Sequence, residues 1–218
     1  MPTQDNQRNN SNQQSIVVND FVIPSRNIQT AEQHRGRHFQ IWFDTQPERL
    51  GFYIKDLGIG FGVFKKMDTY GLGPDFQQGR IELRDNMLVN VGEAYMVVNL
   101  LPEGAEEDEP LDTLKLKIFG GTNNGDVYEY SIEQMQGGER SILMGRTPDC
   151  DIKINDKLLS KVQSHIKVEF YSDNSFKWVL FDGAVKGKPS TNGTWLYIND
   201  DMKLYDGMVF KANQTIFQ

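Results

Sequence analysis

The chain has 218 residues, of which 38% are hydrophobic and 24% are charged, and its formal net charge is −7. Such a content of apolar residues can build one large folded domain or two domains of about a hundred residues each. The acidic excess argues against a general binder of nucleic acids or acidic membranes, because those proteins need Lys and Arg to displace counterions. We therefore expect neither nucleic acid nor membrane among the partners.

The single cysteine, Cys150, excludes an internal disulfide and a multi-cysteine metal site. Nothing near Met1 resembles a signal peptide, and no stretch approaches the roughly 18 apolar residues of a membrane span. We expect a cytoplasmic protein, with cytoskeletal or nuclear association as alternatives.

Two polar segments divide the chain. Residues 1–15 are rich in Asn and Gln and are too polar to form a core, so they are predicted to be a tail. Residues 103–113 begin with the acidic run EGAEEDEP, which is typical of a linker. The sequence therefore predicts one domain at residues 16–102 and another at residues 114–218.

The second domain consists of short segments that are rich in β-branched and aromatic residues, several of which alternate apolar and polar residues with period two. Turn residues such as Gly and Asn separate these segments, and no helical periodicity follows Leu114. Strands spaced in this way predict an antiparallel sandwich. The expected strands are 115–119, 127–132, 141–144, 151–154, 166–170, 177–181, 194–198, 208–211 and 215–217.

Three loop motifs stand between these strands. Gly145-Arg146 follows one strand, Ser160-Lys161-Val162-Gln163 precedes another, and Ser190-Thr191-Asn192-Gly193-Thr194 lies between two more. In this order they resemble the G-R, S-R-x-H and N-G-T signature of the forkhead-associated (FHA) family, whose members are β-sandwiches that recognise phosphothreonine peptides. The resemblance covers about 105 residues, and it implies a non-catalytic binding module.

The chemistry of these residues suits a phosphate. A phosphate dianion carries about −1.5 to −2 charges and three strong acceptor oxygens, so it needs fixed donors. Arg146 offers a planar fork of donors, the hydroxyls of Ser160 and Thr191 can add short hydrogen bonds, and Lys161 supplies a positive charge. The resemblance implies that Asn192 binds the backbone of the ligand.

Four further residues are expected to support the loops, namely Gly145, Gln163, Gly193 and Thr194. Two positions depart from the signature of the family. Gln163 replaces a His that braces the loops, and because Gln also donates and accepts, we expect weaker support and not a lost site. Lys161 replaces an Arg, which keeps the charge but loses bidentate geometry.

The first half contains a weak internal repeat of the second. Phe61 occupies the position of Asn192, the loop at residues 65–80 is longer, and the early strands are missing, so we expect a degenerate FHA-like sandwich that does not bind phosphate. The fold class that follows is all-β, with two antiparallel sandwiches in tandem. The matched segments are Asn19-Asp20 with Asn155-Asp156, 52–56 with 178–182, 60–64 with 191–195, and 83–89 with 204–210.

These features together predict a non-catalytic adaptor that binds phosphothreonine-containing proteins. The alternative is a structural subunit of a large assembly, such as a cytoskeletal one, that binds other subunits independently of phosphate. No nucleophile–base pair or carboxylate dyad suggests an enzyme. We expect no cofactor and no metal.

Overall fold

A computed structural model describes Asp20 and residues 38–58, 61–68, 79–100, 112–135, 140–173 and 175–218. The predicted tail and most of the predicted linker lie outside the described residues. Residues 38–218 form one compact unit, to which the following description applies.

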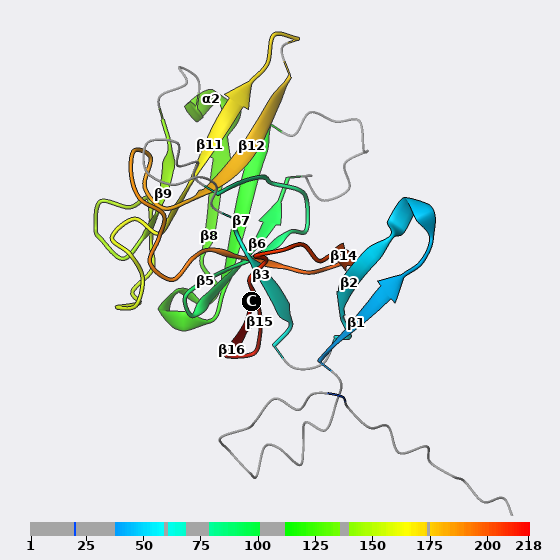
Figure 1. Cartoon of the computed structure of the whole chain (residues 1–218). Helices are drawn as coiled ribbons and strands as arrows, with labels where there is room; N and C mark the ends of the chain where they lie inside the picture. The colour runs from blue at the N-terminus through cyan, green and yellow to red at the C-terminus, as the bar shows by residue number, and fades with distance from the viewer. Residues whose placement is uncertain are drawn as a thin grey trace, which may run out of the picture. The chain divides into compact units, whose positions relative to one another are not determined.

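The described elements are almost all strands (Figure 1). Before residue 101 they are β1 (Phe39–Asp44), β2 (Gly51–Asp56), β3 (Val63–Lys66), β4 (Arg80–Glu82), β5 (Leu88–Val91) and β6 (Ala94–Asn99). After it they are β7 (Thr113–Phe119), β8 (Val127–Ser131), β9 (Ile142–Gly145), β10 (Ile152–Lys153), β11 (Ser164–Phe170), β12 (Phe176–Asp182), β13 (Trp195–Tyr197), β14 (Met202–Lys203), β15 (Phe210–Ala212) and β16 (Thr215–Phe217). Each strand predicted from the sequence overlaps one of these, and the all-β class is confirmed.

Helices are limited to short pieces among the described residues. They are the single turn α2 (Ile132–Met135) and the 3₁₀ turns η1 (Pro47–Arg49) and η3 (Gly121–Asn123). The turn α2 was not expected from the sequence, because four residues are too few to show a helical period.

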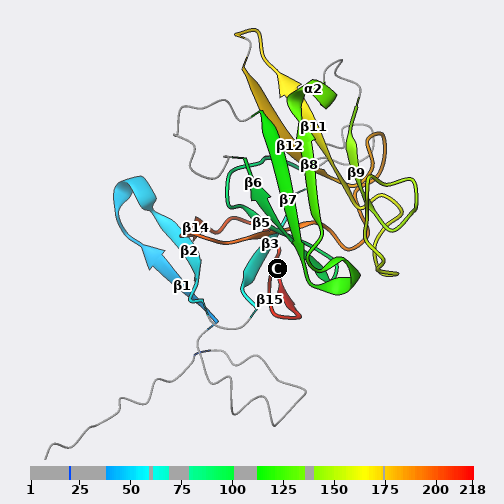
Figure 2. The ribbon, with the colours of Figure 1, turned by 180° about the vertical axis from the view of Figure 1, so that it is seen from behind.

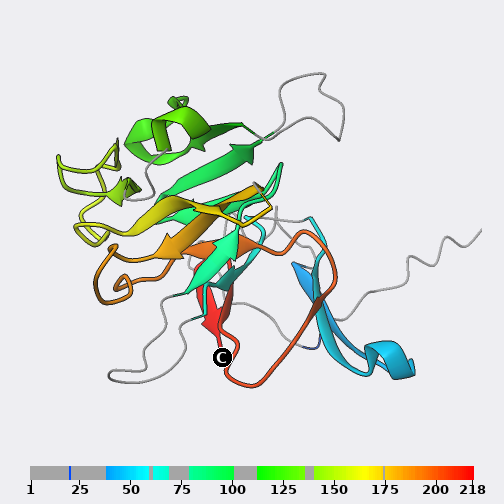
Figure 3. The same ribbon diagram turned by 90° about the horizontal axis from the view of Figure 1, so that it is seen from above.

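The strands form three sheets, whose pairs are antiparallel except for the parallel pair β9–β10. A five-stranded sheet has the order β10-β9-β11-β12-β4, and an eight-stranded sheet has the order β16-β15-β3-β13-β5-β6-β7-β8. The third sheet is β1-β2-β14. From behind, β7 and β8 lie in front of β11 and β12 (Figure 2), and the view from above shows the green strands of the eight-stranded sheet beside the yellow and orange strands β11 and β12 (Figure 3).

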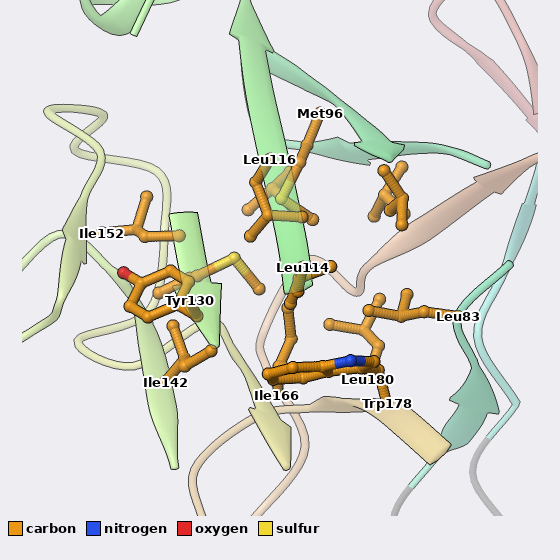
Figure 4. Packing of buried hydrophobic residues seen from close by; sticks show 14 of the residues in the cluster. Leu83, Met96, Leu114, Leu116, Tyr130, Ile142, Ile152, Ile166, Trp178 and Leu180 are labelled. Atoms are coloured by element: carbon orange, nitrogen blue, oxygen red, sulfur yellow. The ribbon is translucent and has the colours of Figure 1, made fainter. Parts of the chain in front are cut away.

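The main core lies between the five-stranded sheet and the eight-stranded sheet (Figure 4). Alternate residues of β7, Leu114, Leu116 and Ile118, are at most 1% exposed, and Trp178 and Leu180 face them from β12. This period-two burial is the pattern that the sequence shows. Burial of side chains of this size stabilises the fold by about 1.5–3 kcal/mol each.

The two predicted domains share their sheets. From the first half, β4 pairs with β12, β5 pairs with β13, and β6 pairs with β7. From the second half, β14 pairs with β2, and both β13 and β15 pair with β3. The predicted boundary at residues 103–113 therefore does not separate two independent sandwiches.

The shared pairing is reciprocal between the two repeats seen in the sequence. The N–H of Leu83 donates to the carbonyl of Trp178 at 2.8 Å, and the N–H of Leu204 donates to the carbonyl of Phe52 at 2.8 Å. Leu83 and Leu204 are equivalent in the repeat, as are Phe52 and Trp178. The end of each repeat thus pairs with the beginning of the other.

The same exchange holds in the eight-stranded sheet. Trp195 of β13 lies opposite Asn90 of β5, and its equivalent Phe64 of β3 lies opposite Lys211 of β15. Gly62 and Gly193, which are equivalent in the repeat, both have positive φ, +83° and +78°, a conformation that favours glycine. The repeat is therefore visible in the backbone as well as in the sequence.

Candidate functional site

The loops that follow β9 and precede β11 are joined through their backbones. The N–H of Arg146 donates to the carbonyl of Ser160, and the N–H of Thr147 donates to the carbonyl of Lys161, both at 3.4 Å. A Cβ atom on Gly145 would lie 2.3 Å from the carbonyl oxygen of Lys161. Only glycine allows this approach, so Gly145 holds Arg146 beside the loop that carries Ser160.

The loop after β12 joins the same group. The hydroxyl oxygen of Ser160 accepts the N–H of Thr191 at 3.0 Å, and the hydroxyls of Ser160 and Thr191 are 3.4 Å apart. The side-chain amide of Asn192 donates to the carbonyl of Leu158 at 2.8 Å. The structure thus brings Arg146, Ser160, Lys161, Thr191 and Asn192 onto three contiguous loops.

Gln163 connects these loops from below and is 0% exposed. Its amide nitrogen donates to the hydroxyl of Ser190 at 2.6 Å and to the carbonyl of Gly193 at 3.0 Å. Its amide oxygen accepts the N–H of Ser160 at 3.0 Å. The side chain therefore satisfies groups of both loops at once.

Asp182, at the end of β12, belongs to this site although the loop motifs do not include it. Its carboxylate accepts the N–H and the hydroxyl of Ser190 at 3.0 and 2.6 Å, and the hydroxyl of Thr194 at 2.7 Å. The equivalent Asp56 of the first repeat also holds the loop that follows it, but through backbone donors, because it accepts the N–H groups of Gly58 and Val63 at 2.8 and 3.0 Å. The pairing of Asp56 with Asp182 in the repeat was the sequence signal that could have found it.

Positive charge collects on the exposed side of the loops. Arg146 and Lys161 are exposed, and neither forms an ion pair with any residue that the structure describes. Lys186 and Lys188, on the loop after β12, are exposed as well. Their charges can act on an anionic ligand without first breaking a bond to a carboxylate of the described residues.

Two side chains near the site that could be reactive, Cys150 and His165, contact backbone carbonyl groups. The thiol of Cys150 donates to the carbonyl of Lys161 at 3.4 Å. Nδ1 of His165 lies 2.8 Å from the carbonyl of Gly183, and the imidazole stacks on Phe181. Burial lowers the pKa of His165. These contacts give both side chains a structural role.

The described part of the chain offers neither a metal site nor a membrane-spanning helix. Its residues contain no cluster of three or more His, Cys, Asp or Glu that could hold a metal ion. No helix among them has the length and the apolar character to cross a membrane.

Residues 142–211 match the family model of the FHA domain. The match begins at β9, ends in β15 and includes all of the predicted site residues. The family resemblance seen in the loop motifs is thereby confirmed for these residues. No curated protein and no solved structure matches the chain.

Proposed function

Because residues 142–211 form an FHA domain, we propose that the protein is a non-catalytic adaptor that binds a phosphothreonine of a partner protein. FHA domains generally bind phosphothreonine peptides, and the loops described above are the part of this domain suited to the task. We place the adaptor in the cytoplasm, in keeping with its single cysteine, which is a free thiol.

The observation that carries the proposal is the joining of three loops around Ser160. Its hydroxyl holds the N–H of Thr191 at 3.0 Å, and its backbone contacts Arg146 and Gln163. Donors fixed in this way need little reordering when they bind, and a preorganised site loses less conformational entropy. The loops are therefore suited to a small, highly charged group.

Each proposed ligand contact follows from the chemistry of its side chain. The guanidinium of Arg146 binds two phosphate oxygens as a fork, and Lys161 adds a point charge. The hydroxyls of Ser160 and Thr191 complete the shell of donors. Asn192 uses one amide N–H for Leu158, so its side-chain amide oxygen and its second amide N–H remain for the backbone of the ligand.

The N-terminal half is, in our proposal, a degenerate second FHA-like unit that exchanges its final strands with the C-terminal unit. The reciprocal pairing of the two repeats supports this assignment. Phe61 is 69% exposed at the position that Asn192 occupies in the second repeat. Because a phenyl ring cannot donate to a peptide backbone, we do not expect this unit to bind phosphothreonine.

A screen of the full chain against a library of phosphothreonine peptides tests the function. We expect binding that is lost when the same peptides lack the phosphate. Phosphoserine peptides should bind more weakly, by about 0.8 kcal/mol if the methyl group of threonine is fully buried. Equal binding of phosphorylated and unphosphorylated peptides would instead support the structural subunit that recognises its partner without phosphate.

A further inference from the structure

A pocket of about 290 Å³ opens directly beside the proposed phosphothreonine site. Asn192 and Gly193, from the loop after β12, line one part of it, and Lys211, Asn213 and Gln214, from β15 and the turn to β16, line another. A ligand backbone held by Asn192 would therefore pass this pocket. Nothing in the loop motifs predicts it, because Lys211 belongs to the hairpin that pairs with the first repeat.

Lys211 is held in place from several sides. Its ammonium lies 4.6 Å from the ring centre of Trp195 and 5.6 Å from that of Phe64. The ammonium donates to the side-chain oxygen of Asn90 at 2.5 Å. Asn90 is 1% exposed, and its amide nitrogen donates to the carbonyls of Gly92 and Ala94 at 3.0 Å each, which fixes the direction of its oxygen.

No carboxylate of the described residues forms an ion pair with Lys211. Among the residues that the structure describes, no Asp or Glu lines the pocket either. Asp156 lies against the Gly92 turn, where its carboxylate accepts the N–H of Glu93 at 3.2 Å, and it does not line the pocket. Burial lowers the pKa of Lys211 to about 8, so the ammonium is still the main form at neutral pH.

The remaining polar side chains of the pocket are amides. Asn213 and Gln214 can each turn an N–H toward a bound group. A half-buried ammonium together with amide donors favours an anionic hydrogen-bond acceptor. Such a group replaces the contacts with water that the ammonium loses on burial. A cationic or apolar side chain would leave the ammonium without that compensation.

We propose that Lys211, Asn213 and Gln214 form a second subsite, which takes an anionic side chain of the same ligand whose phosphothreonine lies on Arg146 and Ser160. This inference rests on the proposed function. This anionic group is a carboxylate or a second phosphate, on a residue near the phosphothreonine. The full recognition unit is then a phosphothreonine together with a neighbouring acidic group.

The test uses the full chain and phosphothreonine peptides in which one other position at a time carries Asp, its neutral isostere Asn, or phosphoserine. We expect the wild type to prefer an anionic side chain over Asn by about tenfold or more at one position, which is the effect of one charged hydrogen bond. The comparison of Asp with phosphoserine at that position identifies which anion the subsite takes.

Two substitutions of Lys211 and one matched control identify the side chain responsible. Lys211→Met keeps the apolar stem over Trp195 and should abolish the preference while leaving the affinity for the Asn peptide unchanged. Lys211→Arg should retain the preference. The control is Lys117→Met, because Lys117 is exposed on β7, lies 5.2 Å from the ring centre of Phe119 and does not line the pocket.

Three outcomes would overturn the inference while leaving the proposed function intact. They are a wild type without any anionic preference, a Lys211→Met protein that keeps the preference, and an equal loss of affinity for the Asp and Asn peptides, which would mark Lys211 as structural. Failure of the proposed function looks different, since the unphosphorylated peptides would then bind as well as the phosphorylated ones.

Discussion

At the scale of single residues, the loops of the proposed site depend on two buried side chains beneath them. Gln163 and Asp182 are both buried, and together they bond to Ser160, Ser190, Gly193 and Thr194. Low exposure strengthens these bonds and makes each of them costly to lose, because the partner left behind cannot turn to water. The geometry of the binding loops is therefore coupled to the stability of the domain.

Replacement of Gln163 tests this coupling. Gln163→Ala leaves the N–H of Ser160 and the carbonyl of Gly193 without their partner, and it opens a cavity. We expect the free energy of unfolding to fall by about 2–4 kcal/mol, as measured by urea denaturation. Gln40→Ala, at an exposed position on β1, is the control and should change it by less than about 0.5 kcal/mol. An unchanged midpoint for Gln163→Ala would show that the loops do not depend on this side chain.

At the scale of elements, the main feature is the position of β13. This strand follows the loop that carries Thr191 and Asn192, and it lies between β3 and β5, two strands of the first half. The proposed site belongs to the second half of the sequence, yet its supporting strand is paired on both sides by the first. The first half therefore acts as part of the scaffold.

Truncation tests this arrangement. The fragment 103–218 lacks both neighbours of β13 and the partners β4 and β6 of β12 and β7. It also loses core residues such as Val89, Met96 and Val98, whose burial contributes about 1.5–3 kcal/mol each against a total stability of about 5–15 kcal/mol. We expect this fragment to give no dispersed NMR spectrum.

The matched truncation is the fragment 38–218, which contains every described strand and should give a dispersed spectrum like that of the full chain. Mixing the fragments 38–102 and 103–218 should restore the spectrum in part, because their strands complement each other. A folded, phosphopeptide-binding fragment 103–218 would contradict the shared sheets.

At the scale of the whole molecule, we expect a buried histidine to make the stability depend on pH. His165 is 1% exposed and burial lowers its pKa, so the folded protein binds its proton less readily than the unfolded chain. The stability that neutral, buried His165 contributes is fully present above its unfolded pKa of about 6.5. It is lost as the pH falls below that value toward the folded pKa.

Unfolding experiments across pH isolate this contribution. Between about pH 7 and pH 5, the wild type should lose more stability than His165→Gln, which retains a donor for the carbonyl of Gly183 but does not titrate. The carboxylates act in both proteins, so the difference between the two curves belongs to His165. If the free energy of unfolding changes with pH in the same way in both proteins, His165 has the same pKa in the folded and unfolded states.

Most strands and most residues of the proposed site can be predicted from short stretches of the sequence. The period-two patterns predict the strands after residue 114, and the three loop motifs identify the residues that the structure places around Ser160. The exchange of strands could not be predicted in this way. Both hairpins, at residues 83–99 and 204–217, carry the same pattern, and a period of two fixes which face of a strand is buried but not which distant strand is its neighbour. The contact of Asn90 with Lys211, and the pocket beside it, depend on that choice of partner.

The most direct test of phosphothreonine recognition is isothermal titration of the wild type, Arg146→Ala and Arg140→Ala with the best phosphothreonine peptide and its unphosphorylated form. Arg140 is an exposed arginine that pairs with Asp151 at 3.9 Å and lies outside the proposed site. We expect Arg146→Ala to weaken phosphopeptide binding by about 2–5 kcal/mol, or at least thirtyfold, and Arg140→Ala to bind like the wild type. Wild-type binding that ignores the phosphate, or an Arg146→Ala protein that binds the phosphopeptide as the wild type does, would contradict phosphothreonine recognition at this site.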